Sequence, residues 1–476
     1  MKKNFFQSRF FKILCLFFLV ICLKLPILIK QPPAIWDEIN YFEGVVEITK
    51  NNLNPFTLYW SYHPPFIMWT TAVIFRLFGH LLLTTRLVTV FWAVVSAIFT
   101  YLLVETIIGR RIEAFLAGVL LIFSPLFMAQ SGLFQMEVPL AAMAIVTVYF
   151  YFRKNWLWFG LTGSALVLTK EPGLLMFALI LIFELIRKLL DRGLQRKWDG
   201  EQIVAFVLPF WVFITWMQFN KLIYGWYLWP YNWNLFTNSS TDLIRNLKEI
   251  YLPILGLFSN LGFWSSVLLI IIFIGIFFDH GRIFREKRIL LLFFIVTIFP
   301  LSFLLGISLT RYLLPIYPFL FSLLAIFSSK IILKKFPLGI FVMIIFIPFL
   351  FTFWHKNLED WEANMNYLKI GKTHQDIAQF LENNCSDKKI LTHWPFWKEW
   401  NFSYLGYVSG RENLYVFSVF EDSSLVDFDY VLVEKDNGLV EKVKPYFGCL
   451  ILEKKFFSEI EQIEINLYKI DKNCLK

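Results

Sequence analysis

The sequence carries little charge and lacks the usual signatures of soluble enzymes. Only 17% of its 476 residues are Asp, Glu, Lys or Arg, whereas 57% are hydrophobic. Its five Cys and six His show no metal-site spacing, and we find neither a Gly-rich phosphate loop nor a Ser nucleophile signature. No internal repeat of about 20–50 residues is present either. These absences argue against the common soluble enzyme classes and leave few ionisable residues as candidates for chemistry.

Long apolar runs take the place of those signatures. Runs of about 18 residues or more recur, and each is long enough to cross about 30 Å of hydrocarbon as a helix. Because lipid offers backbone polar groups no partner, such runs have to be helical. The first run is too long for a signal peptide and lacks a small-residue cleavage site, so we expect it to be retained. The sequence therefore predicts an α-helical polytopic membrane protein.

The apolar runs and the basic clusters between them predict about 11–13 transmembrane helices. Because cytoplasmic loops are enriched in Lys and Arg, the basic N-terminus is expected inside and the tail outside, in the cell membrane. The apolar stretch 66–79 is short and contains Arg76, so we expect it to lie in the outer interface. The spans that we assign are 10–29, 86–108, 112–131, 138–152, 156–170, 173–188, 202–220, 252–277, 289–309, 312–329 and 337–354.

The formal charge of +9 could suggest nucleic-acid binding, but the basic residues occur in short loops between spans. This distribution is typical of topology signals, so we expect membrane lipids as partners and no nucleic acid.

The C-terminal region differs in character from the rest. We expect a transmembrane domain over 1–355 and a small extracytoplasmic α/β domain over 356–476. A helix is expected over 373–384, with strands over 388–394, 413–418, 428–435 and 448–456. Three of the five Cys, Cys385, Cys449 and Cys474, fall in this region, where one disulfide could form.

Two adjacent acids, Asp37 and Glu38, open the first external loop in "AIWDEINYF". Adjacent residues on a helix do not share a face, so one acid could face a site while the other holds it in place. The alternative is that Asp37 merely caps an interfacial helix that begins there.

Other ionisable residues are expected on the same outer side. Glu137 lies at the top of a span, where it could instead be solvated or cap the helix. Lys170 and Arg311 lie at outer helix ends, and Arg86 is nearby in "TTRLV". Cations placed against the positive-inside trend suggest an anionic partner, although single Lys or Arg residues also snorkel. His63 in "YHPPF" could donate a hydrogen bond or be structural.

The order of these motifs resembles that of a known family. The Asp-Glu pair is followed by "HPPF", "LFG", "RLVTVFWAVVSAIFTYLL", an acid before Pro-Leu, "LTKEPGLL" and "RYLLPIYP". This series is similar to GT-C fold glycosyltransferases of the protein O-mannosyltransferase and lipid A aminoarabinose transferase type. The resemblance is good over 30–190, patchy to about 320, and says little about the tail.

The resemblance implies a sugar donor linked to polyprenyl phosphate and a lipid, glycan or protein acceptor. It places Asp37 as the catalytic base, with Glu38 beside it and Glu137 at a second acidic position that is often Asp in relatives. It places Lys170 and Arg311 near the donor phosphate, with Arg86, His63 and Tyr312 as further candidates. Basic residues suffice for one phosphate, so no cofactor is required, although a divalent metal could take part.

Two other interpretations remain open from the sequence. A lipid-linked sugar flippase or polysaccharide exporter would carry ionisable residues at mid-membrane, whereas here they collect at one face. A polymerase that uses pyrophosphate-linked glycans would require a metal and additional acidic ligands.

The aromatic stretch 224–236 could shape an acceptor entrance or form an interfacial belt.

Overall fold

The computed structural model describes most of the N-terminal half of the chain and most of the C-terminal region. The described residues are 8–57, 63–190, 198–228, 230, 291, 310–331, 365–408, 415–418, 427–434 and 448–474.

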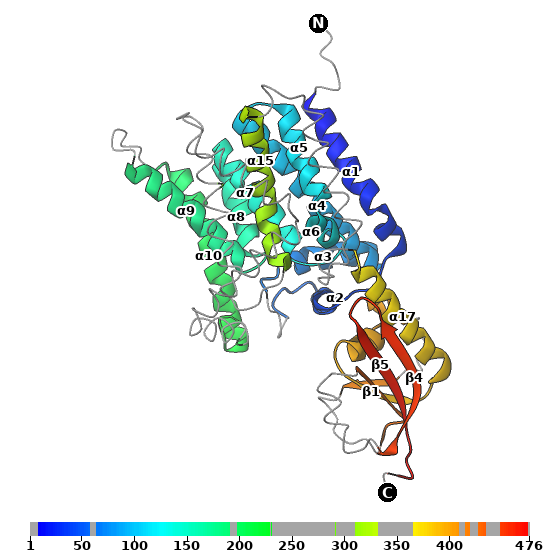
Figure 1. Ribbon diagram of the computed structural model, residues 1–476. Coiled ribbons are helices and arrows are strands. Elements are labelled where there is room, and N and C mark those ends of the chain that lie inside the picture. The colour runs from blue at the N-terminus through cyan, green and yellow to red at the C-terminus, as the bar shows by residue number, and fades with distance from the viewer. Residues whose placement is uncertain are drawn as a thin grey trace, which may run out of the picture.

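A bundle of apolar helices forms the larger part of the described structure (Figure 1). Within the described residues, α1, α4 and α10 are each long and apolar enough to cross a membrane. The shorter helices pack against them, with α4 in the centre of the bundle between α1, α5 and α7. The helices of the bundle are α1 (Arg9–Lys30), α4 (Leu81–Ile108), α5 (Arg111–Phe123), α6 (Pro125–Gln130), α7 (Glu137–Arg153), α8 (Trp156–Val167), α9 (Pro172–Leu190), α10 (Gly200–Tyr224) and α15 (Tyr317–Ile331).

Most expected spans in the described part correspond to single helices, but two are broken at proline. The span expected over 112–131 divides into α5 and α6 at Ser124, because Pro125 restricts the residue before it and lacks an N–H. The span expected over 312–329 begins as a 3₁₀ helix, η2 (Thr310–Ile316), which contains Pro315, and continues as α15. The expected spans 252–277, 289–309 and 337–354 lie outside the described residues, except for residue 291.

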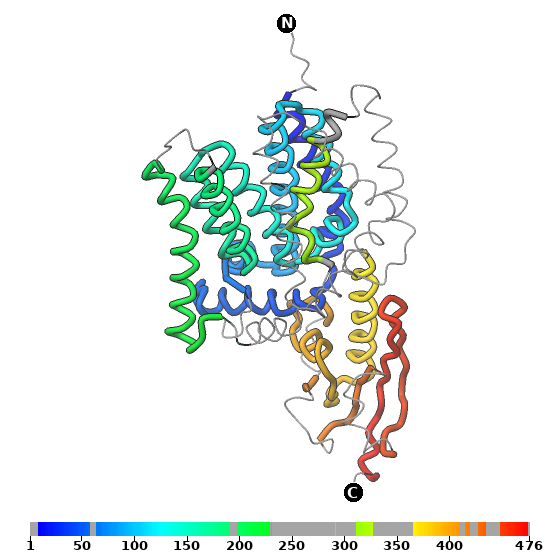
Figure 2. The backbone as a smooth tube through the Cα atoms, turned by 60° about the vertical axis from the view of Figure 1, so that its left-hand side comes forward, coloured from blue at the N-terminus to red at the C-terminus, as the bar shows by residue number. Residues whose placement is uncertain are grey.

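Two further helices, α2 (Asp37–Lys50) and α3 (Phe66–Phe78), lie at the end of the bundle that faces the C-terminal domain (Figure 1). Figure 2 shows α2 running crosswise to the spans. In α3, Ile67 and Met68 are buried, whereas Leu77 and Phe78 are exposed. The expected helix over 66–79 is therefore present, with an apolar end left uncovered by the protein.

The C-terminal domain contains a five-stranded sheet in the order β2-β1-β3-β5-β4. Strands β1, β2 and β3 are parallel, and β5 runs antiparallel to both β3 and β4. The expected helix and four strands are present; β5 was not expected, although "IEINLYKI" alternates apolar and polar residues. The elements are α17 (Tyr367–Asn384), β1 (Lys389–Thr392), α18 (Phe396–Asn401), η4 (Ser403–Leu405), β2 (Tyr415–Ser418), β3 (Tyr430–Glu434), β4 (Leu450–Ser458) and β5 (Ile463–Ile470).

A disulfide joins Cys449 to Cys474, whereas Cys385 is buried and free. The bond ties the segment before β4 to the turn after β5, and so closes the antiparallel half of the sheet.

The two ends of the bundle differ in their chemistry. At the end where α1 begins, Glu105 forms ion pairs with Arg9 and Arg111, each at 3.0 Å. The C-terminal domain lies at the opposite end, beside α2 and α3 (Figure 1).

Candidate functional site

Four ionisable side chains meet at the end of the bundle that faces the C-terminal domain, and we call them the charge cluster. Asp37 and Glu137 are the first residues of α2 and α7, Lys170 lies in the turn between α8 and α9, and Arg311 belongs to η2. Lys170 Nζ lies 2.6 Å from Glu137 Oε1, and Arg311 Nη2 contacts Asp37 Oδ2. Arg311 Nε lies 3.7 Å from Glu137 Oε1, so the two ion pairs form one network.

Exposure divides the charge cluster into an open and a closed part. The side chain of Asp37 is 41% exposed, whereas that of Arg311 is 4% exposed. Lys170 and Glu137 are 8% and 2% exposed. Among the described residues, Glu137 Oε2 has no hydrogen-bond partner. The cluster thus offers one accessible carboxylate above two buried cations and a buried carboxylate.

Two tyrosines line the cluster. Lys170 Nζ lies 4.7 Å from the centre of the Tyr312 ring, and Arg311 Cζ lies 5.6 Å from it, which are cation–π distances. Tyr41 is buried, and burial together with the charge of Asp37 raises the pKa of its phenol well above 10. Tyr41 was not among the candidates predicted from the sequence, although its position one helical turn after Asp37 places it on the same face of α2.

His63 lies at the edge of the charge cluster. Its Nδ1 is 2.8 Å from Glu171 Oε2, and its ring centre is 5.9 Å from that of Tyr41. The backbone N–H of Phe66 donates to Leu168 O at 3.1 Å, which fixes the start of α3 against the end of α8. Glu171, next to Lys170, is a second residue that the sequence analysis did not single out.

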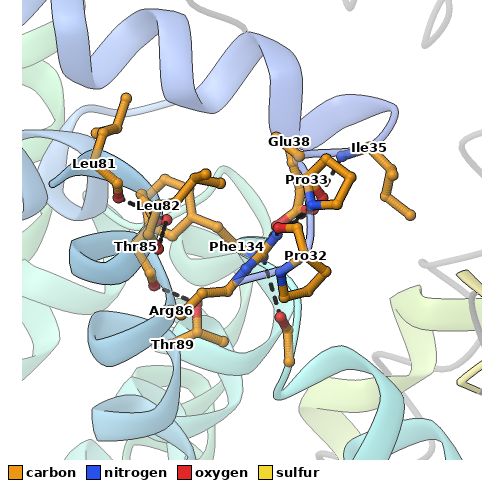
Figure 3. Close-up of polar contacts among 12 residues, drawn as sticks. Pro32, Pro33, Ile35, Glu38, Leu81, Leu82, Thr85, Arg86, Thr89 and Phe134 are labelled. Atoms are coloured by element: carbon orange, nitrogen blue, oxygen red, sulfur yellow. Dashed lines mark hydrogen bonds and ion pairs between the residues drawn. The ribbon is translucent and has the colours of Figure 1, made fainter. Parts of the chain in front are cut away.

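Glu38 and Arg86 form a separate, fully buried ion pair (Figure 3). Besides Arg86, Glu38 accepts the N–H groups of Phe134 and of Ile35, the latter at 3.1 Å. Arg86 also donates to the carbonyls of Pro32, Pro33 and Gly132 at 3.0, 3.2 and 3.1 Å. The pair joins the first loop to α4 and to the turn before α7. Both side chains are enclosed by protein, so the pair stabilises the packing of these three segments against one another.

The backbone before Asp37 is strained. Trp36, the N-cap residue of α2, has φ +49° and ψ −122°. A positive φ in a bulky residue costs about 1–3 kcal/mol and persists only where the surroundings impose it. Asp37 itself is the first helical residue, so the alternative in which it serves as the cap is wrong. The turn instead presents its carboxylate to Arg311.

The described residues contain no group of three or more His, Cys, Asp and Glu arranged to hold a metal ion. The charges of the cluster are instead compensated by one another, two carboxylates against two cations. Such a set can bind an anion through its cations and accept a proton at its exposed carboxylate.

Comparisons with known proteins agree with the resemblance seen in the sequence. The model of the dolichyl-phosphate-mannose-protein mannosyltransferase family matches residues 62–217, which include Glu137 and Lys170. An uncharacterised protein of Aquifex aeolicus (strain VF5) is 25% identical over 283 residues, which are 57% of this chain and 54% of that protein. The chain thus spans about half the length of that relative.

Solved structures identify the fold. The crystal structure of ArnT from Cupriavidus metallidurans bound to undecaprenyl phosphate matches with a TM-score of 0.53 and 13% identity, over 94% of this chain and 97% of that one. The apo structure of the same enzyme gives a TM-score of 0.51 at 14% identity, with the same coverage. The expected GT-C fold is therefore confirmed.

Proposed function

We propose that this chain is an integral membrane glycosyltransferase that moves a sugar from a polyprenyl-phosphate donor to a hydroxyl acceptor, with inversion. The observation that carries the proposal is the charge cluster, in which the exposed carboxylate of Asp37 lies against the buried cation of Arg311. The fold shared with ArnT, whose crystal structure holds undecaprenyl phosphate, supports a lipid phosphate as the donor group.

The donor phosphate is assigned to Lys170 and Arg311. Both are largely buried, so an anion that reached them would form charge-assisted hydrogen bonds with little competition from water. Glu137 contacts both cations and holds them in place. Tyr312 packs against both, and His63 lies farther out beside Tyr41. As the sugar leaves, these cations stabilise the negative charge that develops on the lipid phosphate.

Asp37 is assigned as the general base that takes the proton of the acceptor hydroxyl. Its carboxylate accepts a hydrogen bond from Arg311. A phosphate that recruits Arg311 would loosen this pair and free the carboxylate for the acceptor, so donor binding would prepare the base. Glu38 and Arg86 do not take part in this exchange, because both are enclosed by protein.

The site is assigned to the outer face of the cell membrane, with the N-terminus in the cytoplasm. The basic residues around Glu105 lie at the end of the bundle away from the site, as the positive-inside rule expects of a cytoplasmic end. The disulfide in the C-terminal domain favours an oxidising compartment for the opposite end.

Reconstitution with a doubly labelled donor tests this function. Proteoliposomes would receive polyprenyl-phosphate mannose labelled in the sugar and in the lipid, together with envelope lipids and glycans of the source cell. A transferase releases unlinked polyprenyl phosphate and moves the sugar label to the acceptor fraction. A flippase, the alternative function, moves both labels across the bilayer together. The transferase proposal fails if the mannose donor remains intact and related donors, including the aminoarabinose derivative, remain intact as well.

A further inference from the structure

We propose that the C-terminal domain sets the position of Asp37, and that Trp394 and Tyr407 are the positioning residues. Together with Lys398 and the other residues of 405–407 they form what we call the clamp. The inference rests on the proposed function, because it concerns the base of that reaction. Tyr407 contacts Ala34 and Trp394 contacts Trp36, and these contacts could not be predicted because each joins residues more than 350 positions apart in the chain.

The first part of the clamp forms hydrogen bonds with the backbone on the N-terminal side of Asp37. The N–H of Ala34 donates to Leu405 O at 2.9 Å, and the phenol of Tyr407 donates to Ala34 O at 2.8 Å. Ala34 is fully buried, so both of its backbone polar groups depend on the C-terminal domain. Two residues, Ile35 and Trp36, then separate this fixed point from Asp37.

Gly406, between these two contacts, allows the close approach. Its φ is +89°, and a Cβ there would lie 3.3 Å from Pro33 Cα and 2.8 Å from Leu82 Cδ1. Its carbonyl accepts the side chain of Gln375 at 2.8 Å, which ties the segment to α17. The clamp is thus anchored to α17 of its own domain.

The second part of the clamp holds α2 on either side of Asp37. The Trp394 ring packs edge-on against Trp36, with ring centres 5.0 Å apart. Lys398 Nζ lies 2.6 Å from Glu43 Oε2 and 3.3 Å from Asn40 Oδ1. Trp36 carries the strained backbone of the turn, and a strained conformation requires neighbours that impose it. Trp394 is such a neighbour.

The residues assigned to the donor phosphate lie on other elements than Asp37. Lys170 belongs to the turn between α8 and α9, and Arg311 belongs to η2. Asp37 is the first residue of α2, directly after the segment that the clamp holds. Loosening the clamp would therefore move the base relative to the donor phosphate. The expected consequence is a slower transfer step at nearly unchanged donor affinity, since small misplacements of a reacting group are costly.

Two substitutions in the full-length protein test the clamp. Tyr407→Phe removes the hydroxyl that donates to Ala34 O and that also interacts with Glu399 inside its own domain. We expect kcat to fall about 3- to 10-fold, the range for one hydrogen bond. Trp394→Ala removes the ring contact and should lower kcat about 10-fold or more, whereas Trp394→Phe should restore most of the activity. Donor KM should stay within about twofold in each variant. Hydrogen exchange of the amides of residues 34–42 should become faster, while that of α7 stays unchanged.

Tyr430→Phe is the matched control, because its phenol interacts with Cys385 inside the same domain. It should leave both kcat and loop exchange unchanged. The clamp is refuted if loop exchange does not respond to Tyr407→Phe and Trp394→Ala, or if it responds while kcat does not. An equal loss in Tyr430→Phe also refutes it, by showing general damage to the domain. If the wild type cleaves no polyprenyl-phosphate sugar, the proposed function fails, and loop exchange alone then decides whether the clamp exists.

Discussion

Asp37 and Glu38 are adjacent carboxylates with opposite surroundings. Asp37 is 41% exposed and has Arg311 as its ion-pair partner at the mouth of the site. Glu38 is completely buried, and its oxygens accept hydrogen bonds from Arg86, Phe134 and Ile35. A carboxylate enclosed by donors has no room for an incoming hydroxyl, whereas one with an open side can exchange partners. We therefore propose a chemical role for the first acid and a structural role for the second.

The two arginines differ in the same way. Arg86 is held by one carboxylate and three backbone carbonyls, and so ties three segments together. Arg311 lies between two carboxylates of the charge cluster, one of them exposed. We therefore propose that one carboxylate–guanidinium pair serves stability and that the arginine of the other binds the donor anion. The following substitutions test this comparison, from the largest expected effect to the smallest.

Asp37→Asn should have the largest effect. It keeps the size of the side chain but removes the base, so we expect turnover to fall about 10²–10⁴-fold, the usual contribution of general base catalysis. The amount of folded protein should not change. The measurement is release of polyprenyl phosphate in proteoliposomes, with Glu47→Gln near the other end of α2 as the control. Turnover within threefold of the wild type would remove Asp37 from this role.

Glu38→Ala should act on stability instead. It leaves the charge of Arg86 buried without its carboxylate, which costs about 3–5 kcal/mol. Thermal unfolding in detergent should show a lower midpoint than in Asp37→Ala, because Arg311 keeps Glu137 as a second carboxylate 3.7 Å away when Asp37 is removed. Equal midpoints for the two variants would contradict the comparison.

Arg311→Gln should weaken donor binding. A charge-assisted hydrogen bond to the phosphate contributes about 1.5–3 kcal/mol, so donor KM should rise roughly 10- to 100-fold. Lys170 still compensates Glu137, and Asp37 is partly solvated, so the fold should survive. Arg86→Gln is the matched substitution and should unfold the protein. If Arg311→Gln left donor KM unchanged, the phosphate would have to bind elsewhere.

A third enclosed group, in the C-terminal domain, should give the smallest effect. Burial lowers the pKa of His374, but the nearby carboxylates of Glu399 and Glu461 outweigh burial and raise it to about 10. Because the unfolded value is about 6.5, the stabilisation is complete below that pH and is lost as pH rises towards 10. The free energy of unfolding, measured at pH 7, 8 and 9, should therefore fall by up to about 1.4 kcal/mol per pH unit. In His374→Gln this extra slope should disappear; an identical slope would contradict the assignment.

Much of the architecture could be predicted because its signals are local. The length of the apolar runs predicted the helices, and the Arg in a short run predicted that α3 would differ from a span. Asp37, Glu137, Lys170 and Arg311 each lie at a helix end, so a consistent topology was enough to expect them on one side. The structure then brings the four into direct contact.

The partners of each residue could not be predicted in the same way. Helix geometry indicates that Asp37 and Glu38 point to different faces, but not which of them points inward. That choice is made by Arg86 and by the N–H of Phe134, which lie 48 and 96 positions along the chain. Tyr41 was within reach of the sequence, because it follows Asp37 by one turn. The clamp was not, since it depends on how a separate domain docks.

A structure with a non-hydrolysable phosphonate analogue of the polyprenyl-phosphate sugar tests the central claim most directly. The account predicts that the phosphonate oxygens bind Lys170 and Arg311. Asp37 should then have separated from Arg311 and should lie on the side of the anomeric carbon opposite the phosphonate. An analogue bound away from these cations, with the pair between Asp37 and Arg311 intact, would contradict the account.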